Sequence, residues 1–373
     1  MADLVLDKVI VDSPGRINII GEHTDYNLGY VLPTAIDKRI RFTLERNNTD
    51  TQCEIRSKGY EKALVVDLKH IAPSNIQWEN YILGVLYEIY KRSQELKGFQ
   101  CTIESDLPVG SGVSSSAALE CGLAFGLNEL FDLGLSKHEI VALSRDAEHN
   151  YVGTKCGIMD QFASVMSKKD HVILLDCKNM EHTYVPFAIA PYQIILLNSN
   201  VSHSLASSEY NTRRKECEEG VAILQKKYPS VASLRDANLK MIETCKTALS
   251  RKVMDRCTYV VQENKTVLDA VEALKKGDLK TLGTLMYQTH EGLRTLYEVS
   301  CRELDFLVDF SKNIAEVLGA RVMGGGFGGC TINLVHEDAA DAFIKSASEA
   351  YEKEFNIKLT SFEGHPSAGT TLL

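Results

Sequence analysis

The first 67 residues of the chain alternate between apolar and polar positions, and the apolar positions are rich in β-branched side chains. An alternation with a period of two is typical of strands that bury one face. It predicts strands at residues 4–11, 16–20, 40–44, 53–56 and 63–68, and a further strand at 99–104. The amino-terminal part of the chain is therefore expected to build a sheet.

The apolar pattern changes to helical spacing after residue 76. A helix is predicted from about residue 76 to 96, because its apolar positions share one face and Gly98 provides a stop. Residues 114–130 are apolar or small almost all round, which is typical of a buried helix. Ser136 and Glu139 form the capping-box pattern that opens a third helix, which runs to about residue 150.

The second half of the chain is mostly helical and closes on a small strand–helix–strand unit. Strands at 171–176, 183–187 and 193–197 precede helices over about residues 207–318, and strands at 321–323 and 331–335, a helix at about 337–354 and a strand near 359–362 follow. A length of 373 residues suggests two domains. We predict an α+β fold with a mixed-sheet domain at residues 1–185 and a helix-rich domain with a small sheet at residues 186–373.

Composition narrows the class of protein. The formal net charge of −9, with 41 Lys and Arg against 50 Asp and Glu, argues against nucleic-acid binding, which needs basic patches. No stretch approaches the roughly 18 consecutive apolar residues of a membrane span. The first residues lack a signal-peptide pattern, so we expect a cytoplasmic protein. The ten cysteines have no C-x-x-C or zinc-finger spacing and are expected to be free thiols, mostly buried.

Polar residues gather in a turn that follows an apolar strand. Glu22, His23 and Asp25 lie close together there, with Arg16 nearby. Two carboxylates, an imidazole and a guanidinium could match a polyhydroxy ligand such as a sugar, because each sugar hydroxyl both donates and accepts a hydrogen bond. A solvated polar turn would have the same composition, and the spacing alone does not separate these two interpretations.

A glycine- and serine-rich loop, Gly110–Ser116, opens the predicted buried helix. Glycines let a ligand approach the backbone, and the free N–H groups at a helix start attract anions. The loop lacks the Gly-Lys-Ser/Thr ending of a Walker A motif, so a phosphate here would depend on backbone N–H groups and serine hydroxyls. A buried helix that the serines merely cap is the competing interpretation. We favour the phosphate loop.

Two further segments carry candidate chemistry. Asp160, in Gly157–Gln161, has apolar neighbours with Glu148 upstream, and is either a helix N-cap or a carboxylate in a partly dry site; the local sequence alone favours the N-cap. Residues 324–329 match G-x-G-x-x-G, but a strand follows instead of a helix, and the motif lies near the carboxyl terminus. We therefore reject dinucleotide binding. A glycine turn that lines a site, or tight packing, fits better.

In this order, the segments resemble the galactokinase branch of the GHMP small-molecule kinases, a superfamily that also holds homoserine, mevalonate and phosphomevalonate kinases. The sequence GRINIIGEHTDY at residues 15–26 is similar to the galactokinase signature, and LPVGSGVSSSAA at 107–118 is similar to the nucleotide loop of the superfamily. GGGFGGC at 324–330 resembles its carboxy-terminal glycine motif. CGIMDQF at 156–162 and SHSLASSEYNTRR at 202–214 also resemble galactokinase segments, so the resemblance covers essentially the whole chain.

The resemblance implies a site in the cleft between the two domains, with a role for each matching residue. Asp160 would be the base for the anomeric hydroxyl, and Arg16 would neutralise charge beside it. Sugar contacts would come from Glu22, His23, Thr24, Asp25, Gly157 and Tyr210. The nucleotide would contact Gly110, Ser111, Gly112, Val113, Ser114, Ser115 and Ser116, with Ser57 as a further contact. Ser116 and Glu148 would hold Mg²⁺, which keeps several waters and binds substrate phosphates.

The implied activity is transfer of the ATP γ-phosphate to the 1-hydroxyl of D-galactose. N-acetylgalactosamine or another hexose with an axial C4 hydroxyl stays open as the substrate, because the sequence does not show the volume of the pocket near C2. A sugar sensor without turnover and an NAD-dependent oxidoreductase are two less favoured hypotheses. Trp78 either packs or stacks on adenine. The sequence leaves the oligomeric state open, with a monomer favoured.

The chain departs from the family pattern at three positions. Leu28 stands where we expect glycine or an acidic residue, Ser13 replaces the usual alanine, and Gly324 stands where threonine or serine is common. None of the three is a residue that the resemblance assigns to the base, the metal or the sugar. The departures therefore bear on substrate preference more than on reaction type.

Overall fold

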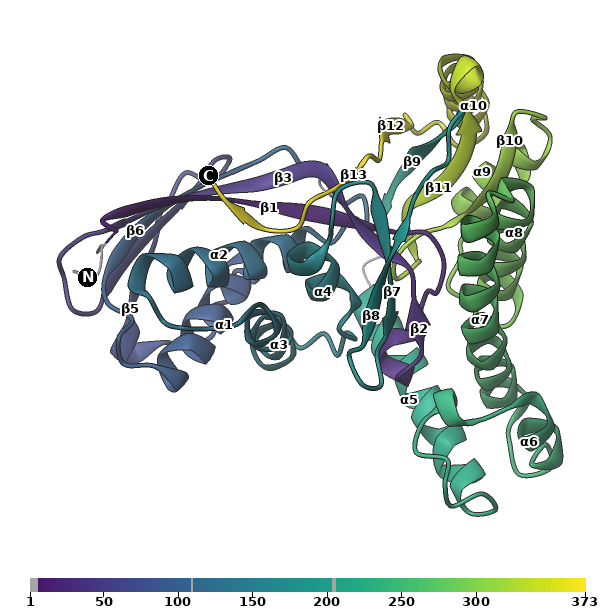
Figure 1. The fold of residues 1–373 in the computed structure, drawn as a ribbon, viewed down its shortest axis with the longest axis horizontal. Coiled ribbons are helices and arrows are strands. Elements are labelled where there is room, and N and C mark those ends of the chain that lie inside the picture. The colour runs from purple at the N-terminus through teal and green to yellow at the C-terminus, as the bar shows by residue number, and fades with distance from the viewer. Residues whose placement is uncertain (1–5, 109, 203–205) are drawn as a thin grey trace.

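The computed structural model describes residues 6–108, 110–202 and 206–373 (Figure 1). Residues 109 and 203–205, which belong to two of the motifs quoted above, lie outside the described residues. All ten cysteines are free thiols, and eight of them are buried. That result confirms the prediction made from their spacing.

A mixed seven-stranded sheet forms the amino-terminal half. Its strands are β1 (Lys8–Asn18), β3 (Pro33–Arg46), β4 (Gln52–Ser57), β5 (Leu64–Asp67), β6 (Phe99–Ser105), β13 (Pro366–Ser367) and β14 (Thr371–Leu372). The spatial order is β14-β1-β3-β6-β4-β5, with β13 beside β3. β4 and β6 run parallel and the other neighbours run antiparallel. The predicted mixed sheet is confirmed.

Helices cover one face of this sheet (Figure 1). They are α1 (Gln77–Arg92), α2 (Ser115–Phe131), α3 (Lys137–Ala147) and α4 (Met159–Met166), and a π-helical turn, Glu148–Val152, extends α3. α2 packs against β1 and β3. A Cβ atom on Gly122 would lie 2.2 Å from a ring carbon of Phe42. The small residues that predicted a buried helix therefore let α2 lie close against the sheet.

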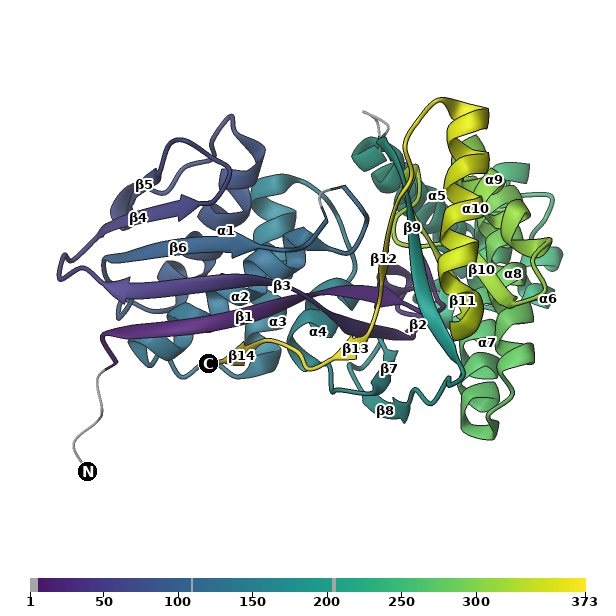
Figure 2. The same ribbon diagram turned by 90° about the horizontal axis from the view of Figure 1, so that it is seen from above.

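The carboxy-terminal half is built on an antiparallel four-stranded sheet in the order β10-β11-β9-β12. Its strands are β9 (Tyr192–Ser202), β10 (Val317–Val322), β11 (Gly328–His336) and β12 (Thr360–Glu363). The helices are α5 (Ala206–Gln225), α6 (Leu239–Thr244), α7 (Arg251–Lys276), α8 (Leu279–Thr295), α9 (Arg302–Lys312) and α10 (Ala340–Phe355). Figure 2 shows α7–α10 grouped beside this sheet, away from the seven-stranded sheet.

A small sheet of β2 (Tyr30–Val31), β7 (His171–Asp176) and β8 (His182–Pro186) completes the strands. Short 3-10 helices lie at Asp25–Asn27, Leu68–His70, Leu234–Asp236 and Glu337–Ala339. Separate apolar clusters fill the space under the seven-stranded sheet, between the helices α5–α9, and beneath α10. The α+β class expected from the sequence is confirmed.

Several boundaries differ from the sequence prediction. Residues 4–11 and 16–20 were expected as two strands, but β1 is one long strand with an irregular register between Pro14 and Arg16. The helical region ends at Lys312 instead of residue 318, because β10 already begins at Val317. The division at residues 185 and 186 stays a prediction. The carboxy-terminal strands β13 and β14 return across it to pair with β3 and β1.

Candidate active site

A narrow cavity lies where the turn after β1, the start of α4, helix α5 and the loop between β10 and β11 meet. It is lined by Arg16, Glu22, His23, Asp25, Cys156, Met159, Asp160, Tyr210, Gly324 and Gly325. Six of these residues are predicted site residues, and they come from three separate stretches of sequence. The fold therefore gathers four of the six sugar-binding candidates, together with Arg16 and the candidate base, in one place.

Backbone hydrogen bonds shape the turn that carries Glu22, His23 and Asp25. The Thr24 hydroxyl lies 2.9 Å from the Gly21 carbonyl and 2.6 Å from the Tyr30 carbonyl, to which it can donate. Thr24 is fully buried and does not line the cavity. Its hydroxyl therefore holds the turn, and a sugar contact by Thr24 stays a prediction. His23 takes a φ of +61°, which directs the chain sharply at this point.

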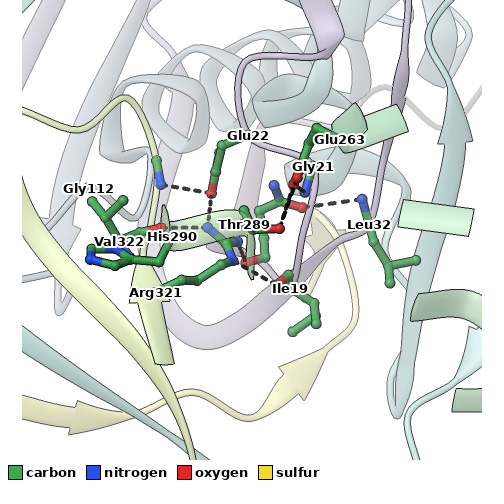
Figure 3. A network of polar contacts seen from close by, with 12 residues as sticks. Ile19, Gly21, Glu22, Leu32, Gly112, Glu263, Thr289, His290, Arg321 and Val322 are labelled. Carbon is green, nitrogen blue, oxygen red and sulfur yellow. Dashed lines mark hydrogen bonds and ion pairs between the residues drawn. The ribbon is translucent and has the colours of Figure 1, made fainter. Parts of the chain in front are cut away.

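A buried arginine anchors Glu22 (Figure 3). Arg321, on β10, donates from Nη1 to Glu22 Oε1 over 3.0 Å and from Nε to the Ile19 carbonyl over 2.9 Å. The Gly324 N–H also donates to Glu22 Oε1, over 2.9 Å. Arg321 and Glu22 are at most 1% exposed. This ion pair fixes the turn of the amino-terminal half against the glycine turn of the carboxy-terminal half.

Arg16 and Asp160 form a two-pronged ion pair at the cavity. Arg16 Nε donates to Asp160 Oδ1 over 2.7 Å, and Nη2 donates to Oδ2 over 3.0 Å. Burial alone would lower the pKa of Arg16, but Asp160, Glu22 and Asp25 outweigh that effect and raise it. The guanidinium therefore stays charged. Asp160 lies in the first turn of α4, and the N-cap role that its local sequence favoured is wrong, because the N-cap residue is Ile158 and Asp160 makes this ion pair instead.

Asp25 and Gly157 are in close contact across the cavity wall. A Cβ atom on Gly157 would lie 2.0 Å from Asp25 Oδ2, so only glycine fits at this position. The Met159 N–H donates to the same oxygen over 3.4 Å. Burial raises the pKa of Asp25 to about 7, and the nearby Asp160 carboxylate contributes to this rise. Near pH 7 the Asp25 carboxyl group can therefore be protonated or ionised, so it can donate or accept a hydrogen bond.

His23 and Tyr210 form an aromatic edge of the cavity. Their ring centroids are 5.3 Å apart. Burial lowers the pKa of His23 to about 3, against the opposing effect of the Gly325 carbonyl. The imidazole is therefore neutral at physiological pH. Its Nε2 is buried and makes no hydrogen bond of normal geometry with the described residues.

The glycine- and serine-rich loop borders this cavity. The Gly112 carbonyl accepts from Arg16 Nη1 over 2.7 Å, and the Ser114 hydroxyl donates to Asp160 Oδ2 over 2.5 Å. Ser114 is the N-cap residue of α2, yet its side chain makes no capping hydrogen bond. The helix-capping interpretation of these serines therefore lacks support at Ser114. Gly110 and Gly112 have φ values of +71° and +72°, which glycine adopts without strain.

The other loop residues differ in exposure. Ser111 is buried and donates to the Pro108 carbonyl over 2.8 Å, and Val113 is buried. Ser115 is exposed and Ser116 is half-buried, so their hydroxyls can face a ligand.

Ser57, at the end of β4, is half-buried and does not line the cavity. Trp78 is half-buried, and its ring lies 4.5 Å from the exposed ring of Tyr60.

Magnesium binding by Glu148 and Ser116 stays a prediction. Gln161 Nε2 donates to Glu148 Oε2 over 3.0 Å, and the Glu120 and Cys156 side chains also interact with the Glu148 carboxyl group. Burial raises the pKa of Glu148 to about 7, and Asp160 adds to this effect. One carboxylate and one hydroxyl suit an ion that keeps most of its waters. No cluster of three or more His, Cys, Asp or Glu side chains that could hold a metal occurs in the described part of the chain.

Sequence reasoning missed several residues around the cavity. Three of them line it, namely Cys156, Met159 and Gly325. Two others belong to the carboxy-terminal half and bond to the turn that carries Glu22: Arg321 donates to Glu22, and Glu263 accepts from Gly21. Glu263, on α7, accepts from the Gly21 N–H over 2.9 Å. A charged residue inside the apolar strand at 321–323 was the one available signal for Arg321. Nothing in the local pattern of an amphipathic helix distinguishes Glu263 from a solvated residue.

Comparison with known proteins identifies the same family that the sequence motifs resemble. The chain matches the family models described as the galactokinase galactose-binding signature at residues 5–46, the GHMP kinase N-terminal domain at 80–168 and the GHMP kinase C-terminal domain at 270–353. Galactokinase from Thermosipho africanus is 42% identical over 97% of this chain and 99% of its own length. Galactokinase from Thermotoga maritima is 43% identical over 96% of this chain and 98% of its own length.

Solved structures agree with this assignment. The crystal structure of Lactococcus lactis galactokinase complexed with galactose has a TM-score of 0.94 and 32% identity, and the match covers 99% of this chain and 96% of that one. A mevalonate kinase matches with a TM-score of 0.66 at 19% identity, over 96% of this chain and 99% of that one, which indicates a shared fold. No helix in the described residues is long and apolar enough to cross a membrane.

Proposed function

This chain belongs to the galactokinase family of the GHMP kinases, and we propose that its cavity binds D-galactose beside a loop that holds the phosphates of ATP. The reaction transfers the γ-phosphoryl group to the anomeric hydroxyl and yields galactose 1-phosphate and ADP. The observation that carries this proposal is the Arg16–Asp160 ion pair. It lies between the sugar-binding candidates and the Gly110–Ser116 loop, where the acceptor hydroxyl and the phosphate must meet.

Asp160 is suited to receive the proton of the attacking hydroxyl. Arg16 and the Ser114 hydroxyl hold its carboxylate in a fixed orientation, since together they donate three hydrogen bonds to it. As the bond from the anomeric oxygen to the γ-phosphorus forms, the bond from this phosphorus to the β–γ bridging oxygen breaks, and the proton passes to Asp160. A positioned base of this kind contributes on the order of 10²- to 10⁴-fold.

Charge neutralisation falls to Arg16 and the loop. Phosphoryl transfer depends mainly on positioning and on groups that balance the charge of the phosphate oxygens. Arg16 stays charged beside the reacting centre, and the N–H groups at the start of α2 face the same region. We propose that Ser116 and Glu148 hold Mg²⁺, which when bound would neutralise charge on those phosphate oxygens.

N-acetylgalactosamine stays a second candidate substrate, and a second cavity beside the first is where its acetamido group could be accommodated. This cavity of about 130 Å³ shares Asp25 and Cys156 with the first and is also lined by Gly157 and Met180. An acetamido group needs room of this kind next to the sugar. The glycine turn at 324–329, by contrast, joins the antiparallel strands β10 and β11. It does not open a helix, as dinucleotide binding requires.

Release of ADP from ATP and Mg²⁺ tests the proposal, with D-galactose, N-acetylgalactosamine and D-glucose measured side by side. We expect turnover with galactose, loss of turnover in Asp160→Asn, and retained galactose and ATP binding by calorimetry in that variant. Asp12→Asn is the matched control, because Asp12 pairs with Arg41 over 2.7 Å outside the cavity. Normal turnover by Asp160→Asn would remove Asp160 from its role. Binding of galactose without any turnover would favour a sensor.

A further inference from the structure

A chain of hydrogen bonds runs from the interior of the carboxy-terminal half to the cavity. Cys217 Sγ, on α5, lies 3.2 Å from the hydroxyl of Tyr297, which follows α8. The Tyr297 hydroxyl lies 2.8 Å from the Tyr26 hydroxyl, which lies 2.8 Å from His23 Nδ1. Cys217, Tyr297 and His23 are at most 3% exposed, and Tyr26 is half-buried.

The direction of donation along this chain follows from the chemistry of its members. A neutral imidazole has one nitrogen that donates and one that accepts. The phenol O–H is a stronger acid than a neutral imidazole N–H, and the imidazole nitrogen is the better acceptor. The favoured arrangement therefore has Tyr26 donating to His23 Nδ1 and Tyr297 donating to Tyr26. The thiol of Cys217 is a weak donor, and it forms the end of the chain that is farthest from His23.

His23 Nε2 then carries the hydrogen. This atom is buried and makes no hydrogen bond of normal geometry with the described residues, although the Gly325 carbonyl lies near enough to the imidazole to raise its pKa; the His23 side chain lines the cavity. A buried donor without a well-formed hydrogen bond is unfavourable. A ligand oxygen in the cavity could accept a hydrogen bond from this N–H and remove that cost. The two ends of the chain are thus different: one is a weak thiol donor, and the other is a single N–H on a side chain that lines the cavity.

We propose that Tyr26, Tyr297 and Cys217 are positioning residues that hold His23 in the Nε2–H tautomer, so that it offers one N–H donor to an oxygen of the sugar. This inference rests on the proposed function for the identity of the ligand. Tyr26 and His23 come from the turn after β1, whereas Tyr297 and Cys217 come from the carboxy-terminal half. The tautomer therefore depends on the packing of the two halves against each other.

The tautomer can be observed directly in the full-length chain labelled with ¹⁵N-histidine. Multiple-bond ¹H–¹⁵N correlation spectra distinguish Nε2–H from Nδ1–H imidazoles, and His23→Gln identifies the His23 signals by their loss. We expect wild-type His23 to be the Nε2–H tautomer without any sugar present. Tyr26→Phe removes the donor to Nδ1 and should give a mixture of tautomers. Tyr297→Phe should have a smaller effect and Cys217→Ala a smaller one still, with Cys217→Ser close to wild type.

Steady-state kinetics provide the second readout. Tyr26→Phe should raise the KM for galactose roughly five- to tenfold, the equivalent of one hydrogen bond, while the KM for ATP changes less than about twofold. Tyr351→Phe is the matched control, because its buried hydroxyl donates to the Ser199 carbonyl over 2.9 Å away from the cavity. That variant should change neither the His23 signals nor either KM.

Two results would overturn the inference: an Nδ1–H tautomer in the wild type, or a tautomer and galactose KM that Tyr26→Phe leaves unchanged. Failure of the wild type to phosphorylate any sugar would instead contradict the proposed function. The spectra are recorded without sugar, so they decide the role of the hydrogen-bond chain in either case.

Discussion

Removal of the Arg321 guanidinium is predicted to destabilise the protein more than any single surface substitution. Arg321 is fully buried on β10 and donates to Glu22 Oε1 and to the carbonyls of Asn18, Ile19 and Val322 (Figure 3). Arg321→Met keeps a similar length but removes every one of these donors. Glu22 then retains only the Gly324 N–H among the partners of its Oε1.

The magnitude follows from the burial of the pair. Loss of one partner from a buried ion pair costs about 3–5 kcal/mol, because the remaining charge is left uncompensated. A typical domain has a free energy of unfolding of only about 5–15 kcal/mol. Since 1 kcal/mol corresponds to roughly 2–4 °C for a unit of 150–250 residues, the thermal midpoint should fall by roughly 6–20 °C.

Differential scanning calorimetry of the wild type and three variants tests this prediction. Arg302→Met is the control, because Arg302 pairs with Glu354 at the surface and is 76% exposed in its side chain. Its removal should cost no more than about 1 kcal/mol. The double variant Glu22→Gln with Arg321→Met should regain part of the loss, since a neutral amide replaces the stranded carboxylate. Midpoints are compared, because a two-domain chain need not unfold in one step.

A thermal midpoint of Arg321→Met within about 2 °C of that of Arg302→Met would refute this role of the buried ion pair. Such a difference corresponds to a change in unfolding free energy of only about 1 kcal/mol or less. A double variant no more stable than Arg321→Met would show that the uncompensated charge of Glu22 is not the cause of the loss.

Three further predictions concern the cavity and the residues that support it. Gly157→Ala should abolish galactose binding in calorimetry, because its Cβ would lie 2.0 Å from Asp25 Oδ2; binding at wild-type affinity would show that Asp25 does not hold the sugar. Tyr210→Ala should weaken galactose binding more than ATP binding, since Tyr210 lines the cavity beside His23; equal losses for both ligands would contradict that placement. Burial raises the pKa of Glu263 from 4.5 to about 7, so the group adds stability that is fully present below about pH 4.5 and lost as pH rises through about 7. Glu263→Gln should flatten this part of the curve of thermal midpoint against pH, by the equivalent of on the order of 3 kcal/mol, and an unchanged curve would refute the assignment.

The sequence by itself predicted the fold class and most of the candidate site residues. Period-two alternation identified β3, β4, β5 and β6, and small residues identified the buried helix α2, because these patterns report which face each element buries. The motifs at residues 15–26 and 107–118 are local in sequence. They therefore indicated a family, although not the geometry in which their side chains meet.

Tertiary structure decided which partners those side chains have. The sequence could not place Arg321 against Glu22, 299 positions apart, or join Cys217 and Tyr297 to the turn that carries His23. It also could not show that the Thr24 hydroxyl bonds to the Gly21 and Tyr30 carbonyls and so holds the turn. Hydrophobic periodicity records which face of an element is buried. Hydrogen bonds between elements that are far apart in the sequence form only when tertiary packing places those elements side by side.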